Sequence, residues 1–270
     1  MVKKERLDAL LVQRGLAPSR EQAKRLIMAG LVLNGTELAD KPGTRIKEDA
    51  ALSVKGTLHP FVSRGGMKLE KALRVFDVSL VDRVVVDVGA STGGFTDCAL
   101  QHGAALVYSV DVGYGQLAWK LRIDPRVRVM ERVNFRHVNP EAFDPAPEAA
   151  VMDVSFISVA KLLPKLLTVL KPGSAVVTLV KPQFEAGPSF VGKGGVVRDR
   201  MVHESVVEQI MEAAARQGYL VRGLTGSPIL GGDGNVEFLL WLQAGGVAEP
   251  VNIRVAEVVA EAHEKGAAER

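Results

Sequence analysis

A short apolar run followed at once by a glycine-rich turn restricts the fold of this chain more than any other feature. Residues 83–87 read Arg-Val-Val-Val-Asp without polar alternation, which is typical of a central parallel strand covered on both faces. Residues 89–95 read Gly-Ala-Ser-Thr-Gly-Gly-Phe and lead into a segment of helical character. Small residues there allow backbone amides and a helix N-terminus to approach a ligand closely. The pattern predicts an α/β sheet with a ligand site after its first strand.

The spacing of these glycines favours one class of ligand. Asp111 ends the next apolar run about twenty residues further on, where a carboxylate typically binds ribose hydroxyls. Dinucleotide enzymes and methyltransferases share this arrangement, but Ser91 stands in place of the central glycine that a pyrophosphate requires. S-Adenosylmethionine carries no pyrophosphate, so we expect this methyl donor as the cofactor. The expected contacts in this region are Gly89, Ala90, Ser91, Gly93, Gly94, Phe95 and Asp111.

Further apolar runs extend the predicted sheet. The runs at 127–130, 149–153 and 175–180 alternate with segments of helical pattern, which predicts parallel strands joined by helices. The last two runs, 219–224 and 236–242, have only a loop with Gly and Pro between them, so we expect them to be antiparallel. We predict a Rossmann-like α/β fold of the class I methyltransferase type, with a mostly parallel sheet and an antiparallel last strand.

The front of the chain is a separate, basic module. Residues 1–76 contain 15 Lys and Arg against 8 Asp and Glu, whereas residues 77–270 contain 19 against 23. Two short helices are predicted at 6–16 and 20–28, followed by a hairpin around Asn34-Gly35 and a strand at 51–54. A compact segment with a balance of +7 is typical of a module that binds a polyanion, although solvated surface charge gives the same composition.

The second predicted helix carries a cationic stripe. Arg20 and Lys24 share one face, with Arg25 beside it, and Ser19 is placed to cap the helix. The segments Arg6-Leu7-Asp8, 19–27 and 32–35 resemble the S4 RNA-binding domain, a small α+β module. The resemblance implies contact with structured RNA, mostly through its shape and phosphates. The implied RNA-binding residues here are Arg6, Arg20, Lys24 and Arg25.

Four charged residues occupy positions where charges are unfavourable unless they are used. Lys68 begins a helix, Asp153 and Lys181 each end a buried strand, and Glu237 lies inside the last predicted strand. The carboxyl ends of strands line the ligand crevice in doubly wound sheets. Ordinary surface ion pairs could explain any one of these residues, but four in register are harder to explain in this way.

This quartet, with Ser63-Arg64 upstream, resembles the Lys-Asp-Lys-Glu tetrad of FtsJ-type ribose 2′-O-methyltransferases. Joined to an S4-like domain, the whole chain is similar to the TlyA family of haemolysin A-like rRNA methyltransferases. The resemblance implies 2′-O-methylation of cytidine in 16S or 23S ribosomal RNA, free or within a ribosomal subunit. It implies further donor contacts at Val112, Asn134 and Asp153, and an RNA contact at Arg64.

The chemistry places a demand on Lys181, the central lysine of the tetrad. A ribose hydroxyl is a weak nucleophile, so holding its oxygen in line with the methyl carbon and sulfur dominates the rate. Lys181 is expected either to accept the hydroxyl proton or to orient the hydroxyl as an ammonium group. Proton acceptance needs a neutral lysine, whereas Asp153 and Glu237 favour its charged form. The sequence leaves both roles open, and Asp153 is also expected beside the sulfonium.

The remaining predictions concern the domain boundaries, a glycine-rich loop, metal binding and the cellular location. We predict an S4-like domain at 1–58, a linker at 59–66 and a methyltransferase domain at 67–270. The glycine-rich loop after Lys181 is expected to be a mobile lid whose Lys193 and Arg198 contact RNA phosphate. One cysteine and five histidines without ligand spacing predict no metal site, and we expect neither a membrane span nor a secretory signal. We expect a cytoplasmic protein.

Two other classes of function remain as alternatives. One is a non-catalytic RNA-binding or haemolysin-like protein, which the missing apolar span disfavours. The other is a nicotinamide-dependent oxidoreductase, which the glycine spacing disfavours.

Overall fold

The computed structural model describes residues 4–28, 30–55, 60–246 and 251–268, and it divides the chain into two compact units. Unit 1 spans Met1–Pro60 and unit 2 spans Phe61–Arg270. Each unit has its own hydrophobic core. The linker predicted at 59–66 overlaps the start of unit 2, because Phe61 is buried in the core of that unit and Gly65 begins a helix.

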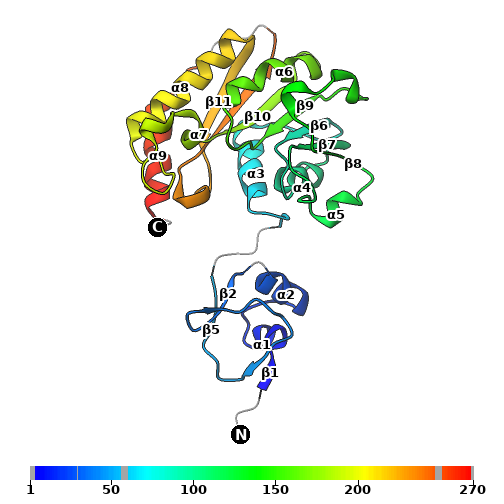
Figure 1. Ribbon diagram of the computed structural model, residues 1–270, viewed down its shortest axis with the longest axis vertical. Helices are drawn as coiled ribbons and strands as arrows, with labels where there is room; N and C mark the ends of the chain where they lie inside the picture. Colours follow the sequence, from blue (N-terminus) through cyan, green and yellow to red (C-terminus); the bar gives the residue numbers. More distant parts are fainter. Residues whose placement is uncertain (1–3, 29, 56–59, 247–250, 269–270) are drawn as a thin grey trace. The chain divides into compact units, whose positions relative to one another are not determined.

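Unit 1 is a small α+β module (Figure 1). Its elements are β1 (Lys4–Arg6), α1 (Leu7–Gln13), α2 (Arg20–Met28), β2 (Val32–Asn34), β3 (Glu37–Leu38), β4 (Arg45–Lys47) and β5 (Leu52–Val54). Strand β2 pairs with both β3 and β5, and Gly35 turns the β2–β3 hairpin at a φ of 64°. The predicted cap is confirmed, because the backbone N–H of Gln22 donates to Ser19 Oγ over 3.2 Å. Leu7, Leu11 and Ile27 form the centre of the core.

Unit 2 contains the predicted α/β sheet. Its helices are α3 (Gly65–Phe76), α4 (Gly94–Gln101), α5 (Trp119–Arg122), α6 (Leu163–Val169), α7 (Pro182–Glu185), α8 (Arg200–Arg216) and α9 (Val255–Ala268). Its strands are β6 (Val84–Val88), β7 (Leu106–Asp111), β8 (Val127–Glu131), β9 (Ala149–Met152), β10 (Ala175–Val180), β11 (Tyr219–Gly226) and β12 (Phe238–Ala244). Five short 3-10 turns lie between them: η1 (Phe135–His137), η2 (Pro140–Ala142), η3 (Val159–Lys161), η4 (Pro188–Phe190) and η5 (Gly232–Gly234).

The order of the strands confirms the predicted fold class. The strands lie in the order β11-β12-β10-β9-β6-β7-β8, and strands β6 to β10 are all parallel to one another. The last strand, β12, is inserted between β10 and β11 and is antiparallel to both. A mostly parallel sheet whose last strand is reversed is therefore present.

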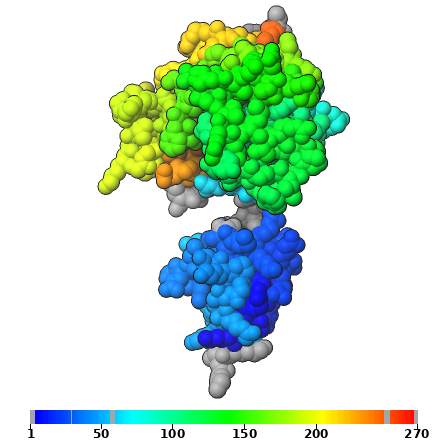
Figure 2. All heavy atoms as spheres, turned by 45° about the vertical axis from the view of Figure 1, so that its right-hand side comes forward, coloured from blue at the N-terminus to red at the C-terminus, as the bar shows by residue number. Residues whose placement is uncertain are grey.

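Helices cover both faces of this sheet (Figure 1). Alternate residues of β6 enter different cores: Val86 and Val88 pack with α6, α8 and α9, whereas Val85 packs with α3 and α4. Because side chains alternate along a strand, an uninterrupted apolar run fills both layers. In the space-filling view, the yellow-green segment that precedes α8 lies at the margin of this unit (Figure 2).

One boundary differs from the prediction at a residue that matters. Strand β12 begins at Phe238, so Glu237 lies just before the strand and not inside it. The reason is local, because η5 and the contacts of Asn235 turn the preceding residues out of the ladder. Glu237 still accepts at its backbone oxygen from Ser227 N over 2.8 Å, so it is held at the end of the sheet.

Candidate active site

The site lies where the order of the strands reverses. Strand β6 continues to β7 on one side, and the chain later returns to β9 on the other side of β6. The loops that leave the carboxyl ends of these strands diverge there, which opens a crevice between them. The glycine turn after β6 and the residues after β7, β9 and β10 all reach this edge.

Two glycines of the turn are required by their surroundings. Gly89 has a φ of 84°, and a Cβ there would lie 2.7 Å from the backbone oxygen of Asp153. Gly93 has a φ of 95° and precedes α4, where a Cβ would lie 2.3 Å from Leu121 Cδ1. Both conformations are unfavourable for residues with side chains. The turn therefore runs directly against the end of β9, and its backbone faces the crevice.

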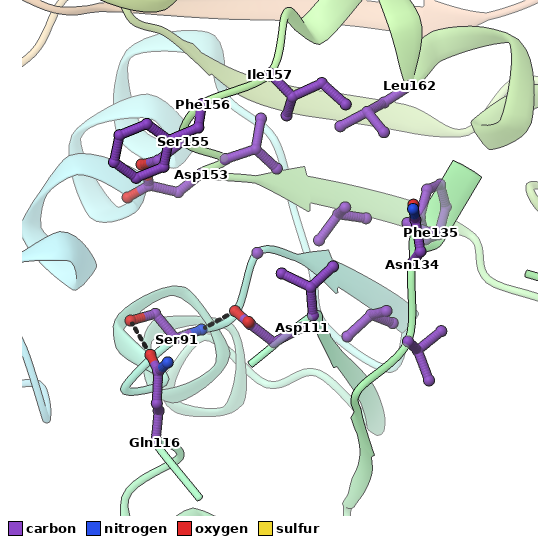
Figure 3. Close-up of a pocket in the computed structure, with 16 residues that line it drawn as sticks. Ser91, Asp111, Gln116, Asn134, Phe135, Asp153, Ser155, Phe156, Ile157 and Leu162 are labelled. Atoms are coloured by element: carbon purple, nitrogen blue, oxygen red, sulfur yellow. Dashed lines mark hydrogen bonds between the residues drawn. The ribbon is translucent and has the colours of Figure 1, made fainter. Parts of the chain in front are cut away.

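Asp111 fixes the other wall of the crevice. Its Oδ2 accepts from Ser91 N over 2.8 Å, and its Oδ1 accepts from Gly113 N over 2.7 Å. Ser91 Oγ in turn donates to Gln116 Oε1 over 3.3 Å (Figure 3). Each carboxylate oxygen retains a free lone-pair direction, because an ionised carboxylate has about four acceptor sites. Asp111 can therefore hold the loop and accept from ribose hydroxyls together.

The crevice contains a cavity of about 360 Å³. Its side walls are apolar and include Val110, Val133, Ile157 and Leu162, whereas Asp111, Asn134 and Asp153 supply polar groups. Apolar walls suit an adenine ring, a carboxylate suits ribose, and a second carboxylate suits a positive sulfonium. The donor set therefore fits S-adenosylmethionine.

Most of the predicted donor contacts line this cavity or the hollow next to it. The cavity is lined by Gly89, Ser91, Asp111, Val112, Asn134 and Asp153, and the hollow by Ala90, Gly94 and Phe95 as well. Gly93 lines neither and acts as the N-cap of α4. Asn134 also caps η1, where its Oδ1 accepts from Arg136 N over 3.1 Å. Their roles toward a donor stay predictions.

A second hollow of about 280 Å³ adjoins the cavity and shares Gly89, Ser91, Asp153 and Ser155 with it. Lys68 from α3 and Lys181 from the end of β10 also line it. This hollow is more polar than the cavity, and a substrate hydroxyl in it would lie beside the donor's reactive end.

The predicted quartet comes together as two ion pairs. Lys68 Nζ lies 2.6 Å from Glu237 Oε2, and both side chains are buried, at 8% and 2% exposure. Lys181 Nζ lies 2.6 Å from Asp153 Oδ1 at the wall of the hollow. Gly231 is needed behind this arrangement, because a Cβ there would lie 2.1 Å from Glu237 Oε1. Four residues far apart in sequence therefore meet at one edge of the sheet.

The loop after β9 contributes residues that sequence reasoning missed. Ser155 Oγ accepts from Lys181 Nζ over 2.9 Å, and Phe156 and Ile157 line the cavity. Phe156 has a φ of 63° and is 90% exposed, and its ring packs 4.9 Å from that of Phe184. Residues that directly follow a parallel strand reach the ligand crevice, so their place in the sequence was the signal that could have identified them. Gln116, after β7, carries the same signal.

Asp87 is a further missed residue, inside β6 beneath the glycine turn. Complete burial raises the pKa of its carboxyl to about 7, and the nearby Asp153 also raises it. Thr96 Oγ1 donates to Oδ2 over 2.6 Å, and among the described residues Oδ1 has no hydrogen-bond partner. An acid inside an otherwise apolar strand was the signal in the sequence.

Two of the predicted RNA-binding residues of unit 1, Arg6 and Arg20, contact the buried acid Asp8. Arg6 donates to both oxygens of Asp8 over 3.0 Å, and Arg20 lies 3.2 Å from Asp8 Oδ2. Hydrogen bonding from Arg6 is the main reason that the pKa of Asp8 is lowered to about 2. Asp8 therefore orders both guanidinium groups, which remain partly exposed. Lys24 and Arg25 are exposed on α2.

In unit 2 the predicted RNA-binding residues are exposed near the hollow or on the loop before α8. Arg64 precedes α3 and lines the hollow, and Lys193 and Arg198 are exposed. The mobile lid expected here stays a prediction, and the structure shows that part of the loop is buried. Val196 and Val197, between the two cations, are 4% and 1% exposed. Burial of these valines anchors the loop to the body of the unit.

The other expectations concern metals, membranes and two side chains. Cys98 is buried, and His203 is buried on α8, where its Nδ1 lies 2.7 Å from His263 Nε2. Within the described ranges, no cluster of three or more His, Cys, Asp or Glu could hold a metal ion. The described helices include none with the length and apolar character needed to cross a membrane.

Comparisons with known proteins match both units. The model of the FtsJ-like methyltransferase family matches residues 61–244, and the S4 domain model matches residues 5–52. "Putative rRNA methyltransferase YqxC" of Bacillus subtilis (strain 168) is 56% identical over 97% of this chain and 95% of that protein. "16S/23S rRNA (cytidine-2'-O)-methyltransferase TlyA" of Mycobacterium tuberculosis (strain ATCC 25618 / H37Rv) is 46% identical over 90% and 91%. The solved structure "Putative hemolysin from Streptococcus thermophilus" is 50% identical, with a TM-score of 0.79 and coverage of 100% and 99%.

Proposed function

The chain belongs to the FtsJ-like methyltransferase family, and on this premise we propose that it methylates the 2′-hydroxyl of cytidine in ribosomal RNA. S-Adenosylmethionine is the methyl donor. The observation that carries the proposal is the pair of ion pairs, Lys68–Glu237 and Lys181–Asp153, beside the donor cavity. The S4 domain match and the ordered arginines around Asp8 support RNA as the substrate.

The cavity and the hollow give the proposed reaction its geometry. The donor, when bound, supplies an electrophilic methyl group on a positive sulfur. Asp111 would hold the ribose of the donor, and the glycine turn would hold its amino-acid end. A substrate hydroxyl in the hollow would lie within reach of Lys181, which Asp153 and Ser155 hold in place. Alignment of this kind is the main source of rate in a displacement.

The two ion pairs favour an orienting role for Lys181. Lys181 Nζ lies 2.6 Å from Asp153 Oδ1 and also donates to Ser155 Oγ, so the amine is held in one place beside the hollow. Lys68 is paired with Glu237 at the same distance, so each lysine has its own carboxylate partner. Lys181 therefore donates a hydrogen bond to the hydroxyl oxygen and fixes its direction, and the hydroxyl proton leaves to water as the new bond forms. Asp153 contacts Lys181 on one side and stabilises the positive sulfonium proposed on its other side.

The closing test is to map ribose methylation in ribosomal RNA from cells with and without this protein. We expect a cytidine 2′-O-methyl group that disappears when the gene is deleted and returns with the wild-type gene. We place the reaction in the cytoplasm. Purified ribosomal subunits and free RNA are assayed separately, because the substrate is one or the other. Methylation on a base or on no RNA would contradict the proposal. Titration with S-adenosylmethionine and NAD is the second arm, and preference for NAD would contradict the assigned donor.

A further inference from the structure

Asn235 is buried between two loops, and its side chain makes three hydrogen bonds to them. It is 2% exposed. Its Oδ1 accepts from Val197 N over 3.1 Å, and its Nδ2 donates to Gly195 O and to Gly232 O, both over 3.0 Å. A carboxamide meets this set because it offers an acceptor and two donors on one flat group. An aspartate of the same shape would turn an oxygen toward two carbonyl oxygens.

These bonds hold the loop that carries two exposed cations. Gly192 N donates to Val196 O over 3.0 Å, which closes the turn around Lys193. The contacts that tie this turn to the rest of the unit include the two bonds of Asn235, the burial of Val196 and Val197, and a contact between His203 and the backbone of Val197. In Figure 2 the yellow-green segment that contains the turn stands at the margin of unit 2. Loss of the Asn235 bonds would loosen the glycine-rich part of this turn, which the buried valines alone do not hold in one conformation.

The same short segment also supports the tetrad. Asn235 O accepts from Gly231 N over 2.8 Å, and Glu237 follows two residues later. Gly231 lies directly against Glu237 Oε1, and Glu237 Oε2 holds Lys68. Residues 231–237 therefore contact the cationic loop through Asn235 and the buried lysine through Glu237. A displacement of Asn235 would reach Glu237 through two peptide units.

We propose that Asn235 is a positioning residue that sets the cationic loop, residues 192–198, at a fixed place relative to the Lys68–Glu237 pair. The inference rests on the proposed function, since it assigns Lys193 and Arg198 to the phosphates of the RNA whose hydroxyl enters the hollow. The RNA phosphates can then bind the loop while the ribose hydroxyl is aligned in the hollow. Asn235 contacts no substrate itself and acts through the loop.

The first test needs no RNA. Asn235→Asp in the full chain is expected to speed trypsin cleavage after Lys193 about tenfold, because local opening of a segment controls its proteolysis. Asn139→Asp is the matched control: Asn139 is exposed, caps η2 through Oδ1, and should leave the cleavage rate unchanged. In the wild-type chain, hydrogen exchange at the Val197 amide should be slow. Equal cleavage rates in the two variants, or fast exchange at Val197, would overturn the proposal.

The second test measures turnover on RNA. Asn235→Asp is expected to raise KM for RNA about tenfold and to lower kcat less, with the affinity for S-adenosylmethionine unchanged, because the loop acts on substrate alignment. A purely structural role would lower the affinity for both ligands together and would overturn the proposal. Asn235→Ser, whose hydroxyl can replace one of the three hydrogen bonds, is expected to give a KM for RNA between those of the wild type and Asn235→Asp. If the wild-type chain methylates no RNA but Asn235→Asp still exposes Lys193, the proposed function fails and the anchoring role stands.

Discussion

At the scale of single residues, the site is defined by which charges compensate each other. Lys68 and Glu237 are both nearly inaccessible to solvent, and burial of a lone charge is costly unless a partner of opposite sign is in contact. Lys181 also lines the hollow, but its partner Asp153 is more exposed than Glu237, at 21% against 2%. The first pair therefore builds the wall, and the second pair presents its ammonium group to a substrate.

Replacement of Lys181 tests this division. Lys181→Ala is expected to reduce methyl transfer by roughly 100-fold or more, the scale of a lost positioning or proton-transfer group, with RNA affinity nearly intact. Lys181→Arg keeps the charge and should retain measurable turnover. Single-turnover assays and binding titrations check both outcomes, with Lys171→Ala, an exposed lysine at the other end of β10, as the control. Wild-type turnover in Lys181→Ala would remove the residue from the mechanism, and an inactive Lys181→Arg would favour a proton acceptor.

Asp87 makes the stability of the chain depend on pH. Burial raises the pKa of Asp87 to about 7 from 3.8, so the folded state binds more protons than the unfolded state between these values. The free energy of unfolding should then fall as pH rises through this window, by on the order of 2 kcal/mol between pH 5 and 7. Asp87→Asn removes the titration and should flatten this dependence in urea unfolding.

The matched control for that measurement is Asp82→Asn, an exposed aspartate shortly before β6. It should leave the dependence on pH as in the wild-type chain. Equal slopes in Asp87→Asn and the wild type would mean that Asp87 does not titrate in this range.

At the scale of elements, helix α2 has one buried face and one exposed, cationic face for which we predict RNA contacts. Ala23 and Ile27 are buried in the core of unit 1, whereas Arg20, Lys24 and Arg25 remain exposed. Such a division follows from the spacing of three to four residues between neighbours on one side of a helix. The element was predictable from sequence, but the contact that orders Arg20 was not, because Asp8 lies twelve residues earlier on α1.

Removal of two cations from this face tests its role. Arg20→Ala with Lys24→Ala is expected to weaken RNA binding and to reduce the slope of log affinity against log salt by about 1 to 2. The reason is that a protein with fewer phosphate contacts releases fewer counterions when it binds. Arg126→Ala with Arg128→Ala, two exposed cations at the start of β8, is the control. An unchanged salt slope in the α2 variant would identify the stripe as plain surface. Circular dichroism shows whether unit 1 stays folded without the Arg20–Asp8 contact.

At the scale of the whole molecule, the chain joins two units with separate cores and different charges. The described part of the basic unit contains one small hydrophobic core, whereas two extensive cores enclose the sheet of the second unit. The matches to an S4 domain and to an FtsJ-like methyltransferase fall on the two units in the same order. The methyltransferase match thus falls on the unit that contains the crevice, and the match to an RNA-binding type of domain falls on the other unit.

The sequence by itself determined the elements and the identity of the charged quartet. Apolar runs, helix caps and glycine turns depend on local chemistry, so β6, the Ser19 cap and the Gly35 hairpin could be predicted from neighbouring residues. The antiparallel last strand was also predictable, because the loop before it is too short for a crossover helix.

Only the tertiary structure decided which side chains are partners. The pairing of Lys68 with Glu237 spans 169 residues, and no local pattern carries information on a contact of that range. The insertion of β12 between β10 and β11, the burial that shifts the pKa of Asp87, and the anchoring of the cationic loop by Asn235 have the same origin. Each depends on how distant segments pack, because packing sets solvent access and brings hydrogen-bond partners into contact.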